Sequence, residues 1–547
     1  MKGPSKRKRG EGPPISLPLS AEDPLVTQKK AVLHANGLSL LLSLTSSSRE
    51  TLNKFIESAR VLSFNEEELY FFTQPRGDEE ASIPLISPRN EATALHLCTV
   101  ALESANQTEF VLELVVGLQE KRAELGGPDT PSTEEVESSA SLAPGAATLE
   151  WAVERGVNSR VRCGIFEGGL RGVCAVDDIH PGECVLQVPQ TLLITQDMAQ
   201  ISALGAALRA AEEDIDDESV ALLWTIQQRS NPGAEFATFW ASFPESFNTG
   251  LSWSTAALAL LDGSALLDRT IETRQLVRSS YDALFPRLSR ALPQVFPEAL
   301  FTWEKYKWAA ELWNSYALLV KFQDGKQRSC LVPAVGLLNF SPQAHVYRFS
   351  CIDAATSSLR LEAARSCQRG SQCYLAYGAL PNIQLALFYG FVIEDNPYDV
   401  IKVTLEPDPD DPLHQPKTNL LEKLGLPTEH MIGRGRSRQL PTKLLAALRI
   451  LLLDEEEVLR LPALDPLRAP VGKKNEHMVM ETLVGLLEGL LEALPVESVA
   501  GQADLDKDLV LDDDIALIQK YCSSERALLA EALENCTRVW GALDSLL

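Results

Sequence analysis

Two β-rich stretches separated by a long helical stretch constrain the fold of this chain more than any other feature. Residues 149–195 alternate short apolar runs with Gly, Asp-Asp and Pro-Gly turns, a pattern typical of short strands. The same signals return in RSCLVPAVGLLNF, HVYRFSCI and QCYLAYGAL, whereas residues 196–325 show helical periodicity rich in Trp and Leu. We therefore expect one β-rich domain whose strands are distant in sequence, with residues 196–325 as a helical insertion.

The rest of the chain divides by composition. At 547 residues it exceeds what one core supports, so several domains are expected. The Pro/Gly-rich start predicts a disordered tail over 1–25, and helical patterns predict a helical N-terminal region over 26–125. Small, acidic and Pro residues predict a linker over 126–147. The β-rich domain then spans 148–405, and 406–547 is predicted to be helical, with long amphipathic runs such as METLVGLLEGLLEAL.

Charge and hydropathy exclude several classes of function. Hydrophobic residues make up 45% and charged residues 23%, the balance of an ordinary globular protein. The net charge of −25 argues against direct nucleic-acid binding or attraction to an anionic membrane. No apolar segment reaches the roughly 18 residues that a bilayer requires, so we expect an intracellular, cytoplasmic protein. The KRKR run at 6–9 is either a nuclear address or an ordinary basic cluster in a tail.

Ten cysteines are scattered from Cys98 to Cys536. They contain no CxxC pair and no Cys/His spacing typical of zinc sites, so reduced thiols are expected, with neither disulfides nor a metal site. The sequence gives no indication of an oligomeric state.

The stretch LVPAVGLLNFSPQAHVYRF, residues 331–349, ends an apolar run abruptly on Asn339. An Asn before Phe-Ser-Pro is either a simple turn residue or a polar group placed for a ligand. Similarly, Tyr377 alone reads as a half-buried strand tyrosine, and Gly168-Gly169 as a hairpin turn. These residues taken singly leave both interpretations open.

Four stretches in order resemble the SET-domain methyltransferases of the Rubisco large-subunit methyltransferase type, a group that includes the actin-histidine methyltransferase. They are GGLRGVCAVDDIHPGECVLQVPQTLLIT, FWASFPESFNTGLSWSTAALALL, the stretch around Asn339, and YLAYGALPNIQLALFYGFVIEDNPYD. The resemblance spans roughly 120–547. It implies an α+β fold: a SET-type β-rich pseudoknot domain with a helical insertion, followed by an all-helical C-terminal domain. The pseudoknot would set the segments around Asn339 and Tyr377 side by side.

The resemblance also implies a reaction and a site. The methyl donor would be S-adenosyl-L-methionine and the acceptor a side-chain nitrogen of a protein, on lysine or histidine. Such a transfer depends mainly on alignment of the reacting atoms, and an apolar channel favours the deprotonated lysine. The implied residues are Tyr377 for catalysis, Arg171, Gly172, Asn339, Phe340 and Tyr316 for the cofactor, and Tyr389 and Asn382 for the substrate.

Several positions depart from the family pattern. Phe340 replaces the family's His after Asn339, Gly336 replaces an acid, and Ser315-Tyr316 replaces Ser-Arg or Thr-Arg. Each lost charge-assisted bond removes roughly 1.5–3 kcal/mol. Arg171 and His345 are candidates to compensate. Two hypotheses follow: an active protein methyltransferase with an altered cofactor pocket, or a catalytically weak SET-like protein that serves as a protein-binding module.

The C-terminal helices also have two interpretations. In the family this domain helps to present the protein substrate, and KNEHMVMETLVGLL resembles a segment where an Asn-Glu pair, here Asn475-Glu476, opens a helix. Alternatively, these helices simply cover apolar surface of the catalytic domain.

Overall fold

The computed structural model describes most of the chain from Gly145 onward and parts of the region before it. The described residues are 15–19, 23, 25–41, 48–64, 69, 88–103, 111, 114–115, 117–118, 121, 145–166, 170–180, 182–341, 344–348, 352–363, 366–378, 380–396, 398–434, 440–460, 470–495 and 512–546. Within these ranges no helix has both the length and the apolar character needed to cross a membrane. The chain forms two compact units, one of residues 130–394 and 494–523, the other of residues 1–129, 395–493 and 524–547.

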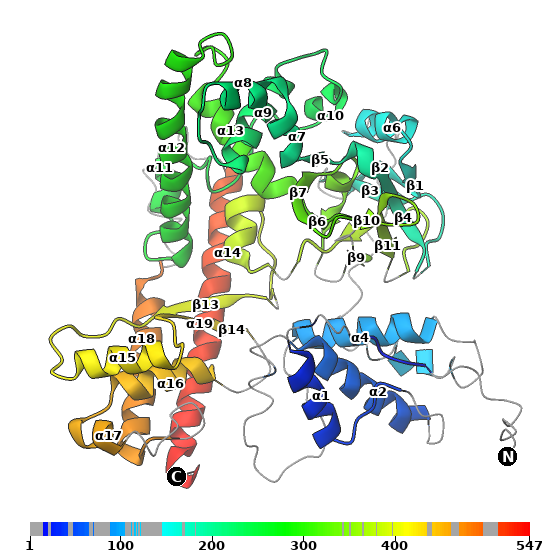
Figure 1. Cartoon of the computed structure of the whole chain (residues 1–547). Helices are drawn as coiled ribbons and strands as arrows, with labels where there is room; N and C mark the ends of the chain where they lie inside the picture. Colours follow the sequence, from blue (N-terminus) through cyan, green and yellow to red (C-terminus); the bar gives the residue numbers. More distant parts are fainter. Residues whose placement is uncertain are drawn as a thin grey trace, which may run out of the picture. The chain divides into compact units, whose positions relative to one another are not determined.

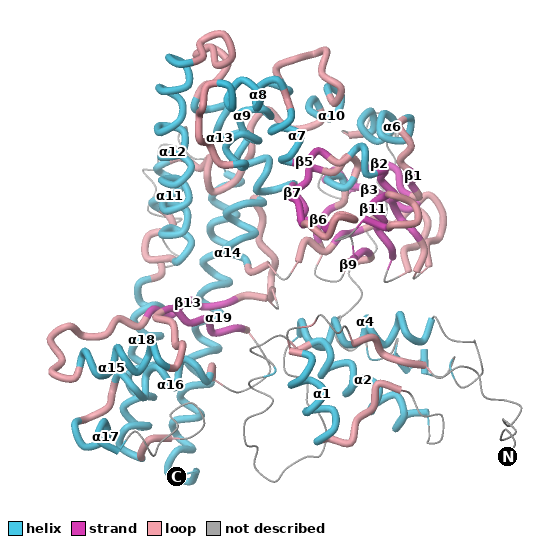
Figure 2. Tube along the Cα trace, viewed as in Figure 1, coloured by secondary structure: helices cyan, strands magenta, loops and turns pink. Residues whose placement is uncertain are grey.

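The first unit is built on a seven-stranded sheet whose strands come from both predicted β-rich stretches (Figures 1 and 2). Its order is β1-β4-β11-β9-β12-β8, with β10 paired to β11. The strands are β1 (Asn158–Ser159), β4 (Cys184–Pro189), β8 (Asn339–Phe340), β9 (Val346–Arg348), β10 (Ile352–Asp353), β11 (Ser358–Ala363) and β12 (Tyr374–Leu375). The sheet therefore joins the two stretches across the helical insertion, as predicted.

Strand β12 positions the candidate site because it pairs in parallel with β8. Tyr374 lies opposite Asn339, and Leu375 lies opposite Phe340. Parallel neighbours cannot be joined by a tight hairpin, so the intervening chain travels through β9, β10 and β11 before returning. The segments around Asn339 and Tyr377 thus lie side by side.

Two smaller sheets accompany the main one. Strands β2 (Val161–Phe166) and β3 (Leu170–Ala175) form an antiparallel pair, and isolated bridges join Cys174 to Gln372 and Ala175 to Arg369. These bridges bring β3 next to the segment that leads into β12. The third sheet has the order β5-β7-β6 and consists of β5 (Ile194–Thr195), β6 (Ala317–Lys321) and β7 (Gln327–Leu331).

The helical insertion lies between β5 and β6. It contains α7 (Gln196–Ile201), α8 (Ala203–Ala210), α9 (Asp217–Arg229), α10 (Ala237–Ala241), α11 (Thr255–Ala259), α12 (Ala265–Ala291) and α13 (Trp303–Tyr316). Ser and Asp side chains cap helix starts, such as Ser202 before α8 and Asp216 before α9. The Trp residues of this region were predicted to be core, and Trp240, Trp253, Trp308 and Trp313 are buried, with Trp303 packed partly against them.

Three local expectations differ from the structure. Residues 149–154, expected to start the strands, belong to helix α6 (Ala146–Glu154), whose apolar side pairs Trp151 with Phe236. Inside the expected disordered tail, Ile15 and Leu17 are buried and Ser16 bridges to Leu41. The apolar residues of that short segment outweigh its Pro/Gly-rich surroundings. The expected linker lies outside the described residues except at its last positions, which begin α6.

The N-terminal region has its own apolar core. Helices α1 (Val26–Ala35), α2 (Ser48–Ser63) and α4 (Pro88–Glu103) bury Phe55, Leu95 and Leu102 among others. Most of the predicted helical region after residue 103 lies outside the described residues.

The C-terminal region is helical, as predicted, apart from one strand. It contains α15 (His414–Lys423), α16 (Thr442–Leu451), α17 (Glu455–Arg460), α18 (Lys473–Ala493) and α19 (Asp512–Leu546). Strand β14 (Glu429–Gly433) pairs with β13 (Val400–Thr404), so the expectation of an all-helical domain was wrong at this point. Burial alternates along this strand, with His430 and Ile432 buried, but polar and apolar residues do not alternate in EHMIG, so the sequence carries little signal for it.

Candidate functional site

The two predicted cofactor segments meet where β3 faces β8. The side-chain amide of Asn339 donates a hydrogen bond to the carbonyl of Arg171, with Nδ2 and O 2.7 Å apart. A Cβ atom at Gly172 would lie 2.4 Å from Nε2 of Gln372 and 2.9 Å from Nδ2 of Asn339. A side chain at Gly172 would therefore force these groups apart, so this glycine is required for close packing.

Two departures from the family pattern turn out to be complementary. The ring of Tyr316, at the end of α13, packs on Gly336, where a Cβ atom would lie only 2.7 Å from Cδ1 of the ring. Tyr316 also contacts Phe243, with ring centroids 5.0 Å apart. The family pattern has an acid at the position of Gly336 and an arginine at the position of Tyr316, whereas in this chain the two residues pack against each other without charge.

Arg171 lies beside the same two residues. Its Nη2 donates to the carbonyl of Gly336 over 3.3 Å. Together with Tyr316, Phe243 and Leu337 it lines a cleft. A guanidinium at this position offers the cation that the loss of the family's arginine would otherwise remove.

The size of this cleft bears on whether the cofactor fits. Its residues supply a cation for a carboxylate and aromatic surfaces for an adenine, so their chemistry fits S-adenosyl-L-methionine. The cleft itself has a volume of about 20 Å³. Small-molecule sites usually enclose roughly 300–1,000 Å³. A cofactor bound in this cleft would need lining side chains such as Tyr316 to move.

An aromatic cluster lies next to Asn339 and β12. The Tyr377 ring lies 5.2 Å from Phe340 and 5.3 Å from Tyr389, measured between centroids. Phe391 completes the group at 5.8 Å from Phe340. Three of these residues were predicted from the sequence, whereas Phe391 was noted only within the YGF motif. Such walls exclude water and suit an uncharged nitrogen acceptor.

Tyr377 is held in one orientation by its hydroxyl. The O–H donates to the carbonyl of Leu338, 2.7 Å away. Burial, followed by the neighbouring Tyr316 and Tyr389, raises the pKa of Tyr377 above its ordinary value. The phenol therefore stays protonated at neutral pH, with its proton directed at Leu338 and its lone pairs available as acceptors.

The remaining predicted substrate residues occupy different surroundings. Tyr389 ends the single-turn π-helix η5 (Leu385–Tyr389), and burial raises the pKa of its phenol. Asn382 starts the preceding turn α14 (Asn382–Gln384) and is buried. Its amide bonds both backbone groups of Ile393, at 2.8 and 2.9 Å. The structure thus places Asn382 as a support for the chain after Tyr389, and its contact with a substrate stays a prediction.

The structure places His345, a further sequence candidate, away from the cleft. Gly168 and Gly169 are outside the described residues. The ring of His345 stacks on Tyr374 and lies near Cys367 and Cys373, whereas the cleft is lined by Arg171. Gln372, which closes over Gly172, had no signal in the sequence because only the β3 bridge brings it there.

Comparisons with known proteins agree with this geometry. The Rubisco LSMT substrate-binding family matches residues 408–530. The pea (Pisum sativum) enzyme named ribulose-1,5-bisphosphate carboxylase/oxygenase large subunit N-methyltransferase is 26% identical over 68% of this chain and 78% of its own length. The mouse (Mus musculus) actin-histidine N-methyltransferase is 24% identical over 57% of this chain and 53% of its own length.

Solved structures show the same fold. A crystal structure of the SET domain of LSMT bound to lysine and AdoHcy aligns with a TM-score of 0.63 at 23% identity, covering 74% of this chain and 93% of that one. A structure of Rubisco LSMT bound to AdoMet aligns with a TM-score of 0.59 at 22% identity. These matches confirm the predicted resemblance to the SET-domain methyltransferases of the Rubisco large-subunit methyltransferase type.

The Asn-Glu pair of the C-terminal region acts as a buried brace. Glu476 in α18 forms an ion pair with Arg449 in α16, and Nδ2 of Asn475 donates to the carbonyl of Arg449 over 3.1 Å. All three side chains are buried. The pair therefore fixes α16 against α18, within the residues that match the substrate-binding family.

Proposed function

We propose that this protein transfers a methyl group from S-adenosyl-L-methionine to a side-chain nitrogen of a protein. The observation that carries this proposal is the parallel pairing of β8 with β12, which sets Asn339 beside Gly172 and surrounds Tyr377 with aromatic rings. The relatives named as a Rubisco large subunit N-methyltransferase and an actin-histidine N-methyltransferase support it. Lysine and histidine are both candidate acceptors for this chain, because the aromatic walls suit the uncharged nitrogen of either side chain.

The residues divide into two groups by task. Arg171, Gly172 and Asn339 would hold the cofactor, with the Arg171 guanidinium pairing with its carboxylate. The cofactor supplies an electrophilic methyl group on a sulfonium. The hydroxyl proton of Tyr377 is donated to the carbonyl of Leu338, so Tyr377 would orient the acceptor through the lone pairs of its oxygen. Phe340, Tyr389 and Phe391 exclude water, which lowers the pKa of an incoming lysine and favours its nucleophilic form.

The protein partner would be bound through the C-terminal region. Residues 408–530 match a family described as substrate-binding, and the Arg449–Glu476 ion pair gives its helices a fixed arrangement. A rigid surface of this kind limits the entropy lost when a protein substrate docks.

A second function is favoured by one specific observation. Tyr316 packs on Gly336 inside a cleft of about 20 Å³, so the protein could serve as a catalytically weak SET-like binding module. Under that hypothesis Tyr316 permanently occupies space that the cofactor needs.

Calorimetric titration of the full chain with S-adenosyl-L-methionine separates the two functions. The methyltransferase proposal expects saturable binding that is weakened by Arg171→Leu, together with labelling of a protein in cell extract by a radioactive methyl donor. Absence of binding at millimolar cofactor would leave the binding module as the function. Tyr377→Phe in the extract assay then tests whether labelling arises from this site.

A further inference from the structure

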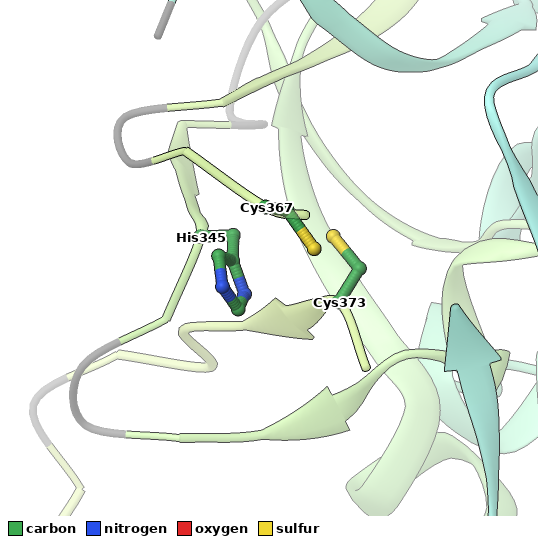
Figure 3. Close-up of side chains that lie close together, drawn as sticks. All are labelled: His345, Cys367 and Cys373. Carbon is green, nitrogen blue, oxygen red and sulfur yellow. The ribbon is translucent and has the colours of Figure 1, made fainter. Parts of the chain in front are cut away.

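Outside the candidate methyl-transfer site, three side chains with metal-binding atoms converge in the first unit. They are His345, Cys367 and Cys373, and one potential ligand atom from each lies within 4.8 Å of the others. Figure 3 shows the two thiols pointing toward each other with the imidazole ring beside them. The three residues come from separate places in the chain: the link from β8 to β9, the segment bridged to Ile179, and the position before β12.

Backbone hydrogen bonds hold all three residues in place. Cys367 and Ile179 exchange two bonds, of 2.8 and 2.9 Å, and the N–H of Cys373 donates to Val173 over 2.8 Å. The N–H of His345 donates to the carbonyl of Tyr374 over 3.1 Å. Gly370, with φ of +80°, turns the chain between the two cysteines. The cluster is therefore preorganised by the sheet and does not depend on one flexible loop.

The two thiols are shielded from solvent. Cys373 is 0% and Cys367 is 2% exposed. The Cys367 thiol interacts with Cys373 and His345, and its Sγ lies 3.7–3.9 Å from the carbonyl oxygens of Ser371, Gln372 and Gln368. Neither cysteine has a part in the proposed methyl transfer. Two buried thiols beside an imidazole are a ligand set that suits zinc.

Distances fit a tetrahedral ion after a small adjustment. Zinc binds sulfur at about 2.3 Å and imidazole nitrogen at about 2.0–2.1 Å, which places tetrahedral ligand atoms roughly 3.5–3.8 Å apart. The present limit of 4.8 Å thus requires closure by about 1.3 Å at most.

The imidazole has to give up one hydrogen bond. Nδ1 of His345 accepts the N–H of Tyr374 over 3.1 Å, so it is unprotonated. A metal on Nδ1 would take that lone pair, and a metal on Nε2 would move the ring proton to Nδ1. In both cases the hydrogen bond between Tyr374 and His345 is lost. Three metal–ligand bonds form instead, one to the imidazole and two to the thiolates.

We propose that His345, Cys367 and Cys373 bind a Zn²⁺ ion whose fourth ligand is water. No other His, Cys or carboxylate joins the group among the residues that the structure describes, and the partly exposed His345 gives the site access to solvent. The ion would join the link after β8 to the residue before β12. It would thereby connect the segment after β8, which carries Asn339, to β12, which Tyr377 follows by two residues, so it would support the candidate site. This replaces the expectation, drawn from cysteine spacing, that the chain has no metal site.

Metal analysis of the full chain tests this proposal without reference to activity. Protein purified under reducing conditions without chelator is expected to hold close to one zinc per chain by mass spectrometry of the elements. His345→Asn and Cys373→Ser are each expected to lower zinc affinity by about tenfold or more. Cys330→Ser is the matched control, because Cys330 is equally buried but lies in β7 outside the cluster, and it should retain the metal.

Cobalt substitution covers the case in which a variant fails to fold. Wild-type protein stripped with a chelator and titrated with Co²⁺ should develop thiolate-to-metal absorption that saturates at one equivalent, and re-added Zn²⁺ should abolish it and raise the thermal midpoint. The proposal would be overturned if wild-type protein held less than about a tenth of an equivalent of zinc and showed no such absorption, although two thiols can be titrated. So would a Cys367–Cys373 disulfide found by mass spectrometry in freshly prepared protein, or undiminished zinc in both ligand variants.

Discussion

The two sides of the candidate site differ in how they relate to the family pattern. The proposed acceptor side consists of aromatic side chains: Tyr377, Tyr389 and Phe391 match the family pattern, whereas Phe340 replaces the family's His. The cofactor side, made of Arg171, Gly172, Tyr316 and Gly336, has exchanged charges for packing. A shape built from rings tolerates few changes, whereas an ion pair can be replaced by apolar packing of similar volume at little cost in stability. We therefore expect the change to affect cofactor affinity more than stability.

The largest effect is expected from removing the phenolic oxygen of Tyr377, on the proposed acceptor side. Tyr377→Phe should lower the rate of methyl transfer by roughly 100-fold, a loss comparable to that of one oriented polar group, while cofactor affinity stays nearly unchanged. Single-turnover assays and calorimetry on the same preparation measure the two quantities. Tyr281→Phe is the matched control, because that hydroxyl also donates to a backbone carbonyl, of Phe301, at 3.1 Å. Equal loss in both variants would mean that the effect is structural.

On the cofactor side, Arg171→Leu should weaken binding of S-adenosyl-L-methionine by about 1.5–3 kcal/mol, roughly 10- to 150-fold. The reason is that Arg171 is the cation in the cleft where the family has another arginine. Calorimetric titration gives the affinity. In the control Arg160→Met, a partly exposed ion pair with Glu183 is lost at a residue that does not line the cleft, and affinity should be unchanged. Unchanged binding by Arg171→Leu would show that the compensation hypothesis is wrong.

The contact between Tyr316 and Gly336 predicts that mutations of the two residues have non-additive effects on stability. Gly336→Ala should destabilise the protein by about 1–3 kcal/mol, because its Cβ would lie 2.7 Å from the Tyr316 ring. In a Tyr316→Ala background the same change should cost much less. Thermal unfolding of the four proteins completes the cycle. If the two changes simply add, Tyr316 and Gly336 are not coupled.

The smallest expected effect is a pH dependence of stability at Glu311, a residue that connects the proposed cofactor side to the proposed acceptor side. This buried residue of α13 accepts hydrogen bonds from Thr249 Oγ1 at 2.6 Å and Ser252 Oγ at 2.7 Å. The N–H of Gly250, in the same loop, donates to the carbonyl of Leu387 over 3.0 Å, next to the turn that carries Tyr389. Glu311 therefore links the helix that ends in Tyr316 to the aromatic wall.

The titration of Glu311 gives this link a pH dependence. Burial raises the pKa of Glu311 above its ordinary value of 4.5, so between that value and the raised one the folded state holds more protons than the unfolded state. Stability must then fall as pH rises through this window. Glu311→Gln, which keeps an acceptor oxygen, should flatten that decline. Thermal midpoints measured from about pH 4.5 to about pH 7.5 test it, and parallel curves for the two proteins would contradict it.

Much of the fold could be predicted because local sequence patterns indicate its helices and its buried residues. The helical insertion, the amphipathic C-terminal helices and the buried Trp residues follow from periodicity and composition. The strand β14 and helix α6 were missed, since short amphipathic segments give weak and ambiguous signals. Ile15 and Leu17 were assigned to a tail because their contacts come from Leu40 and Leu41, which a local window does not include.

The sequence by itself determined the kinds of side chain at the site: a phenol at Tyr377, an amide at Asn339, a missing side chain at Gly172 and no arginine at 316. Only the tertiary structure decided what these groups touch. It showed that Gly336 makes room for Tyr316, that Asn382 holds Ile393, and that His345 faces two cysteines. The physical reason is that these contacts join residues from strands paired across long sequence separations, and such pairing is set by the packing of the whole sheet.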